Sequence, residues 1–209
     1  FNSDLPYDQF IIHQLAGDIL ANQPGQWSKD KLIATGMYAI GNWGNGDADK
    51  EKLHTDIVDD QVDVTSRAFM GLTLACARCH DHKFDPITQE DYYSLLSLLR
   101  NVKRYVKPDD KQAVGTILAD LKSGGQALAV FEQGLTVPPV HVLVRGNAAT
   151  PGKLVSPRFP LIFGPDPASV TPTFSPPPAD AQTVRYRRAL ADWLTSSRHP
   201  LTARVIVNR

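Results

Sequence analysis

Apolar residues recur at the three- and four-residue spacing of amphipathic helices through most of residues 1–105. This spacing predicts a first helix capped by Asp4, a second that begins at Ser28, and a fourth that Thr88 caps. The third and longest helix is expected over residues 49–74. The first half of the chain is therefore predicted to be helical.

Four aspartates of the longest predicted helix share one face, because Asp56, Asp59, Asp60 and Asp63 are spaced by three and four residues. Such a face can hold a cation, but it is also typical of the solvent side of a helix. We favour the solvent side, with an ion pair between Asp63 and Arg67 one helical turn away.

The patterning changes in the second half of the chain. Residues 109–134 predict a helical hairpin broken at Gly124-Gly125, and 11 of the 16 prolines lie between residues 136 and 180. The elements expected after residue 136 are a strand at 140–146, an edge strand at 153–164, an extended linker at 166–182, and helices at 184–197 and 199–209. These elements predict a mainly α fold with a small proline-rich β element.

Composition narrows the classes of partner. The 209-residue chain has 22 Lys plus Arg and 22 Asp plus Glu, so no excess charge favours nucleic acid or an anionic membrane surface. No apolar run approaches the ~20 residues needed to cross a bilayer. The sequence starts at Phe1 rather than Met, and we expect it to be a piece of a longer polypeptide, whose remainder would be one of its partners.

The candidate chemistry is concentrated in LACARCHDHKFDP, residues 74–86, which holds both cysteines of the chain, Cys76 and Cys79, followed directly by His80. This is the Cys-x-x-Cys-His pattern of covalent haem attachment. A zinc held by the same sulfurs and a metal-free redox dithiol are the alternatives. We favour haem, because the chain has no second Cys/His pair for a structural zinc, and a redox dithiol is typical of a βαβ context.

Three more polar residues follow the motif, and they raise the question of a small metal site beside it. We favour a structural role for all three. Asp85 and Pro86 are expected to make the turn before the next helix. Asp81 would accept a hydrogen bond from a ligating histidine, and His82 would belong to the same hydrogen-bonded group.

The segments DLPYDQFIIHQLAGDIL and DKEKLHTDIVDDQVDVTSRAFMGLTLACARCHDHKFDPITQEDYYSLLSLLR resemble the planctomycete cytochrome c-like domain family, a domain of unknown function with a CxxCH motif. The C-terminal RYRRALADWLTSSRHPLTARVIVNR is similar to the start of its usual partner, a second planctomycete domain of unknown function. We therefore expect a helical cytochrome c-like domain at 1–135, a proline-rich β and linker region at 136–182, and the truncated start of a second helical domain at 183–209. This last region is expected to leave its apolar face partly exposed.

The resemblance implies a haem c bonded to Cys76 and Cys79, with His80 as the proximal iron ligand. His82 lies too close to His80 in the chain to reach the opposite face of the same haem. The candidates for a sixth ligand are Met70, Met37 and His54, although each of these also suits a structural role.

The function implied by the resemblance is electron transfer or another redox role in an exported protein of the periplasm or cell surface. Genes of this family lie near those of sulfatases and polysaccharide-degrading enzymes, which suggests a link to polysaccharide or sulfated-glycan degradation, with a redox protein or a glycan as partner. The alternative is a non-catalytic binding or scaffolding module whose motif holds zinc, a disulfide or nothing.

Haem attachment also makes a geometric demand. We expect the two cysteines close together on a short helix or tight turn, with His80 directed into an apolar slot. The lining of this slot is expected from the longest helix and the next one: Val64, Ala68, Phe69, Tyr92, Tyr93 and Leu96. A filled slot with His80 turned to solvent would favour a dithiol or a disulfide instead.

Overall fold

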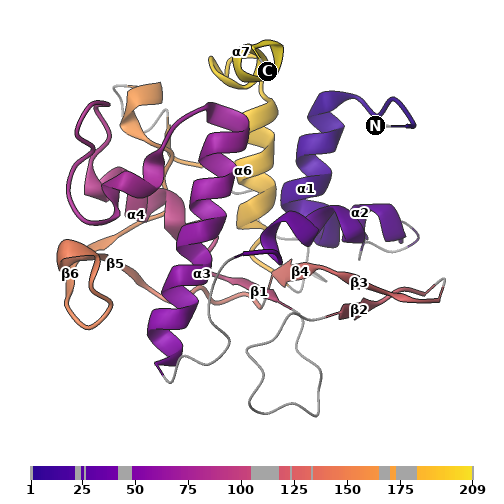
Figure 1. The fold of residues 1–209 in the computed structure, drawn as a ribbon, viewed down its shortest axis with the longest axis horizontal. Coiled ribbons are helices and arrows are strands. Elements are labelled where there is room, and N and C mark those ends of the chain that lie inside the picture. Colours follow the sequence, from indigo (N-terminus) through magenta and orange to yellow (C-terminus); the bar gives the residue numbers. More distant parts are fainter. Residues whose placement is uncertain are drawn as a thin grey trace.

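The computed structural model has the predicted mainly α fold with a small β element (Figure 1). It describes residues 2–21, 25, 27–41, 49–104, 118–122, 124–132, 134–164, 170–172 and 183–208. Most of the predicted linker at 166–182 lies outside these residues. None of the described helices is long and apolar enough to span a membrane.

Helices form at all six of the places where we predicted one outside residues 109–134. They are α1 (Tyr7–Ala21), α2 (Lys29–Ala34), α3 (Lys50–Thr65), α4 (Gln89–Ser97), α6 (Tyr186–Thr195) and α7 (Thr202–Val207). Short 3-10 or π segments are η1 (Thr35–Tyr38), η2 (Ser66–Met70), η3 (Leu74–Arg78), η4 (Val144–Gly146) and η5 (Leu161–Phe163). The strands are β1 (Val102–Arg104), β2 (Leu118–Asp120), β3 (Gln126–Leu128), β4 (Val130–Glu132), β5 (Val140–Leu143) and β6 (Pro151–Val155).

Of the helix caps predicted at Asp4 and Thr88, only the one at Thr88 forms. Asp4 does not cap α1: it has a positive φ of 48°, and the first helical bond runs from the Phe10 N–H to the carbonyl of Pro6, at 2.9 Å. Thr88 does cap α4. Its hydroxyl accepts from the Asp91 N–H at 3.1 Å, while the Asp91 carboxylate accepts from the Thr88 N–H at 3.0 Å.

The longest predicted helix ends just before the cysteine motif. Asp49 starts α3 by accepting hydrogen bonds from the backbone N–H groups of Glu51 and Lys52, at 3.1 and 3.0 Å. The helix continues as the π turn η2 and stops at Gly71, whose φ of 66° is left-handed. The motif therefore begins on a separate short helix, η3, instead of on the long one.

The predicted helical hairpin at 109–134 is wrong for the described part of that segment. β2 pairs with β3 in an antiparallel hairpin, with Leu118 opposite Leu128. Gly124 and Gly125, with φ of 89° and 88°, turn the chain between the two strands. Consecutive left-handed residues favour a hairpin turn, and strands of three residues are too short to show an alternating pattern. The next strand, β4, pairs with β1.

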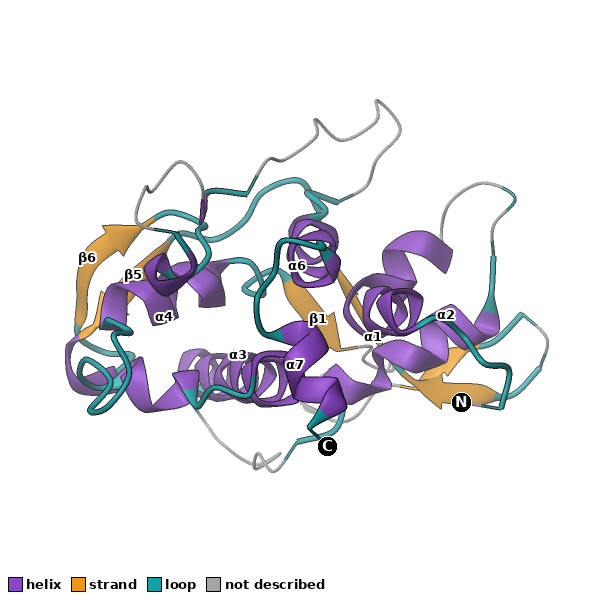
Figure 2. Ribbon diagram, turned by 90° about the horizontal axis from the view of Figure 1, so that it is seen from above, coloured by secondary structure: helices purple, strands orange, loops and turns teal. Residues whose placement is uncertain are grey.

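The predicted β element of the proline-rich region is confirmed. β5 and β6 form an antiparallel hairpin, with Val140 opposite Val155 and His141 opposite Leu154. Figures 1 and 2 show this hairpin beside α4, on the side of the molecule opposite α1 and α2. An ion pair of 2.8 Å between Lys153 and Glu90 joins β6 to α4.

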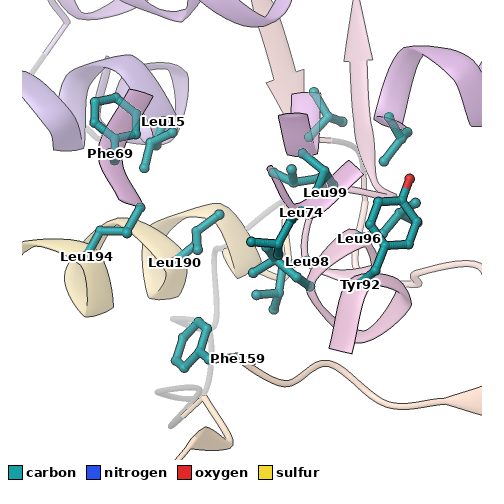
Figure 3. Packing of buried hydrophobic residues seen from close by; sticks show 14 of the residues in the cluster. Leu15, Phe69, Leu74, Tyr92, Leu96, Leu98, Leu99, Phe159, Leu190 and Leu194 are labelled. Atoms are coloured by element: carbon teal, nitrogen blue, oxygen red, sulfur yellow. The ribbon is translucent and has the colours of Figure 1, made fainter. Parts of the chain in front are cut away.

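The C-terminal helix α6 is part of the main core, which corrects our expectation of an exposed apolar face. Leu190 and Leu194 are fully buried, and Figure 3 shows them pointing toward Leu15 of α1 and Phe69 of η2. Burial of a leucine contributes about 2 kcal/mol, so these contacts stabilise the packing of α6 against the N-terminal helices. Within residues 183–208 the widely exposed large apolar side chains are Ile206 and Val207 of α7, so the expected exposure is found for that helix alone.

A buried charge cluster joins α1, β4 and α6. The side chain of Arg187 has no exposed surface, and it forms an ion pair with Asp18 at 2.5 Å and a longer one with Glu132 at 3.6 Å. It also donates to the carbonyl of Leu15 at 2.9 Å. Burial lowers the pKa of Arg187, but Asp18 and Glu132 more than offset that effect and leave it raised. The cation therefore stays charged inside the core.

An aromatic cluster packs around the end of α6. The rings of Phe159 and Trp193 are stacked at 4.2 Å, and the ring of His199 meets Trp193 edge-on at 4.4 Å. His199 is 8% exposed, and its Nδ1 accepts from the Thr202 N–H at 3.3 Å. Its Nε2 has no hydrogen-bond partner among the described residues. Burial lowers the pKa of His199 to about 4.

We expect this histidine to make folding sensitive to acid. Because the pKa of His199 falls from 6.5 to about 4 on folding, the unfolded chain binds a proton first as the pH drops. Its contribution to stability is therefore complete above pH 6.5 and is lost as the pH falls through 4. Between pH 7 and 4.5 the free energy of unfolding of His199→Phe should fall by roughly 2 kcal/mol less than that of the wild type in urea titrations. Equal losses in the two proteins would contradict this prediction.

Candidate functional site

The Cys-x-x-Cys-His motif lies on the short helix η3 and the turn that follows it. Leu74 and Ala77 are fully buried and fix this helix to the core. Cys76 and Cys79 are exposed free thiols on its outer side. The predicted placement of the cysteines on a short helix or tight turn is therefore confirmed, and both sulfurs are open to reagents from solvent.

Arg78, between the two cysteines, anchors the motif by its side chain. Its guanidinium donates to Asp56 at 2.8 Å and to Asp59 at 3.0 Å, both on α3. Burial lowers the pKa of Arg78, but the bond to Asp56 and the charge of Asp59 raise it further, so the cation is held. The acidic face of α3 is thus partly a docking face for the motif. The predicted solvent-side pair on this face, between Arg67 and Asp63, also forms, at 2.7 Å.

The backbone of Arg78 is held as firmly as its side chain. Its carbonyl accepts from the hydroxyl of Tyr93 at 2.9 Å and from the side-chain amide of Gln89 at 3.0 Å, both on α4. Burial raises the pKa of Tyr93 to about 12, so the phenol keeps the proton that it donates. The neighbouring Tyr92 donates to Asp59. Arg78 is therefore fastened to α3 through its guanidinium and to α4 through its carbonyl.

His80 is exposed, and its ring is oriented by the next peptide group. Its Nδ1 lies 2.7 Å from the carbonyl oxygen of Asp81. A carbonyl can only accept, so Nδ1 carries the proton and Nε2 keeps a free lone pair. Histidines that bind metals commonly have this second hydrogen bond, which fixes the tautomer and the ring direction. In this arrangement Nε2 of His80 could ligate a metal.

His82 has the opposite arrangement. It is buried, with 5% of its side chain exposed, and its Nδ1 accepts from the N–H groups of Phe84 at 3.2 Å and Asp85 at 2.9 Å. Its Nε2 therefore carries the proton and lies 3.1 Å from the hydroxyl of Thr73. The Asp85 carboxylate is 3.4 Å from Nδ1, but that nitrogen has no proton to share with it. Nδ1 of His82 therefore stabilises the turn, and Nε2 joins that turn to Thr73.

The two aspartates of DHKFDP are structural as well. The carboxylate of Asp81 accepts from the backbone N–H of Gln89 at 2.8 Å and so stabilises the start of α4. Its backbone carbonyl, and not its carboxylate, is the group that orients His80. Asp85 is in the predicted turn, where its carbonyl accepts from the N–H of Ile87 at 2.7 Å.

The candidates for a sixth ligand are not brought to His80. Met70 is buried in the core, whereas the imidazole of His80 is exposed. Met37 lies on η1, which packs against α1, β3 and β4. At 3.6 residues per turn, His54 points about 170° around α3 from the face that binds Arg78.

The prediction of an apolar slot beside the motif is wrong. Four of its predicted lining residues are packed inside the main core: Phe69, Tyr92, Tyr93 and Leu96. Because His80 is exposed beside this filled core, its ring is not directed into a cavity. Large aromatic side chains were read as the walls of a cofactor site, whereas burial of their own surface is the stronger effect.

The donor set itself suits a covalent haem better than a zinc ion. Among the described residues no group of three or more His, Cys, Asp or Glu side chains converges on a metal site, whereas a structural zinc needs four converging ligands. A haem c requires fewer protein ligands to its metal, because its vinyl groups bond the two thiols and only the histidine reaches the iron. Cys76, Cys79 and His80 fit that demand, although the expected slot is absent.

The role of Arg78 was not predicted from the sequence. The available signal was the spacing of Asp56 and Asp59 by three residues, which offers two carboxylates on one helix face to a single guanidinium. The role of Tyr93 was also missed, because a lining residue was expected where the structure has a hydrogen-bond donor to the motif.

One family model matches the N-terminal part of the chain. No curated protein and no solved structure matches it significantly. The model of a family described as a protein of unknown function, DUF1549 (PSCyt2), matches residues 1–104, which include the whole cysteine motif. Residues 1–104 are therefore similar to this family of unknown function.

Proposed function

We propose that residues 74–85 are the redox centre of an electron-transfer protein, in which Cys76 and Cys79 hold a haem c and His80 ligates its iron. The observation that carries this proposal is the hydrogen bond from His80 Nδ1 to the carbonyl of Asp81. It leaves Nε2 free on the residue that directly follows two exposed thiols. The bound haem would supply an iron that gains and loses one electron.

The residues of the chain have separate tasks in this proposal. The two exposed thiols are open to attachment on the outer side of the turn. Arg78 holds them there, because its side chain is bound to α3 and its carbonyl is bound to α4. His82 supports the turn through both ring nitrogens and takes no part in ligation.

The site of action follows from the same chemistry. Covalent attachment of haem to a CxxCH motif takes place outside the cytoplasm, so we propose a periplasmic or cell-surface protein. Its redox partner would approach the outer side of the turn, where the cysteines and His80 are exposed. A role beside polysaccharide or sulfated-glycan degradation is part of the same proposal.

The absence of a slot for haem favours a second candidate function. Without haem, Cys76 and Cys79 would act as an exposed dithiol that closes to a disulfide, in a protein that binds or organises other exported proteins. Exposed cysteines at this spacing are suited to thiol–disulfide exchange. The packed aromatic residues below the turn support this candidate, since they leave no interior slot for a haem.

Two histidine variants test the primary proposal. In protein exported with a haem-ligation system, His80→Ala should shift the haem absorption bands and the reduction potential, because it removes the only motif histidine with a free nitrogen. His82→Ala should instead lower the unfolding temperature and leave the bands of the folded protein unchanged, because that ring serves the turn. Unchanged bands in His80→Ala, or band shifts with His82→Ala alone, would contradict the assignment.

A further inference from the structure

We infer that the β5–β6 hairpin is part of the cysteine site, and that Gly146 sets the position of the Cys79 sulfur. This hairpin lies outside the region that the family model matches. The inference concerns the sulfur itself and holds whether that sulfur bonds a haem, a second sulfur or nothing.

Gly146 lies very close to the Cys79 sulfur. A Cβ atom added to Gly146 would lie 2.7 Å from Cys79 Sγ and 3.3 Å from Cγ of Arg78. A real Cβ does not approach a sulfur so closely. The backbone of Gly146 therefore lies against one side of the Cys79 sulfur, and a residue with a Cβ would have to displace that sulfur.

The turn that presents Gly146 is strained and tightly hydrogen-bonded. Its two central residues, Arg145 and Gly146, are both left-handed, with φ of 53° and 72°. The Val144 carbonyl accepts from the Asn147 N–H at 3.1 Å, and the Val144 N–H donates to the carbonyl of Thr150 at 3.0 Å. An arginine in this conformation is unfavourable and persists only where its surroundings impose it. The turn is thus held in one shape against the motif.

The hairpin and the motif are both held by helix α4. The Tyr93 hydroxyl on this helix donates to the carbonyl of Arg78 at 2.9 Å, and β5 and β6 pack against the same helix. The ion pair between Lys153 and Glu90 fastens β6 to the same helix, α4. The distance from the turn to the cysteine motif is therefore set by α4.

This arrangement gives the hairpin a chemical role. Any group that bonds Cys79 must approach its sulfur from the side that Gly146 leaves open. Cys76 has no such neighbour among the described glycines, so the two thiols differ in their freedom. The hairpin is thereby a positioning element that orients the Cys79 sulfur within a site composed of two separate parts of the chain.

The first test compares the two thiols in one molecule. Trypsin cleaves after Arg78, so alkylation by iodoacetamide can be followed separately at Cys76 and Cys79. In Gly146→Ala the new methyl group should push the Cys79 sulfur outward and raise its alkylation rate several-fold relative to Cys76. The matched control is Gly124→Ala, which puts alanine at a φ of 89° with nothing within 4 Å of its Cβ, and its ratio should stay unchanged. A ratio unchanged in Gly146→Ala would overturn the inference.

A double-mutant cycle separates the contact from the strain of the turn. Gly146→Ala should lower the unfolding temperature less in a Cys79→Ala background than in a Cys76→Ala background, because only the first removes the sulfur that the methyl group meets. If Gly146→Ala fails to fold, folding restored by Cys79→Ala alone supports the inference. Equal effects in both backgrounds, or failure to fold in both, would overturn it.

Discussion

Arg187→Met should lower the free energy of unfolding by about 3–5 kcal/mol, the largest of the losses that we predict. The new side chain has a similar length, but it leaves the carboxylates of Asp18 and Glu132 inside the core without a cation. Breaking one side of a buried ion pair costs more than the pair contributes, because the remaining charge stays desolvated. Urea unfolding followed by circular dichroism measures the loss.

The neighbouring Arg188 supplies the control. Its guanidinium pairs with Asp192 one helical turn away, at 2.9 Å, on the exposed side of α6. Arg188→Met should therefore change stability by less than about 0.5 kcal/mol. Adding Asp18→Asn to Arg187→Met should recover part of the loss, since one stranded charge is removed. Similar small effects at both arginines would show that the buried cluster is not what joins α6 to α1.

Arg78→Met is expected to have the second largest effect, a loss of roughly 1–3 kcal/mol together with a loosened cysteine motif. The substitution removes the two bonds to Asp56 and Asp59 that fix η3 on α3. Because the two cysteines lie on either side of this anchor, their alkylation rates should rise together. This result differs from that expected of Gly146→Ala, which acts on Cys79 alone.

Arg67 is the matched control for Arg78. It also pairs with an aspartate of α3, Asp63, but its side chain is exposed and it carries no part of the motif. Arg67→Met should leave the unfolding midpoint and the alkylation rate of Cys79 unchanged. If Arg67→Met and Arg78→Met affected the thiols equally, the anchoring role of Arg78 would be wrong.

The helices could be predicted because their signals are local. Thr88 caps α4 through groups three residues apart, and the end of α3 depends on one left-handed glycine, Gly71. The pairing of β1 with β4 could not be predicted in this way. It joins Val102 to Glu132, and each of these strands has only three residues. Their positions depend on packing between distant segments.

In the site, too, local sequence patterns could be predicted, whereas contacts formed only in the folded chain could not. The spacing of Cys76, Cys79 and His80 indicated the candidate chemistry, but sequence alone did not separate the roles of His80 and His82. The difference lies in their hydrogen bonds: one ring keeps a free nitrogen, and the other uses both. The slot was mispredicted because aromatic residues near a motif look the same in sequence whether they line a cavity or fill a core.

The most direct test of the central claim is the mass of the tryptic fragments around the motif. Trypsin separates residues 68–78, which carry Cys76, from residues 79–83, which carry Cys79 and His80. In denatured, reduced protein exported with a haem-ligation system, we predict that these two peptides remain joined by the mass of one haem. Their recovery as two separate, unmodified peptides would contradict a haem c at this site, and peptides joined only before reduction would identify a disulfide in its place.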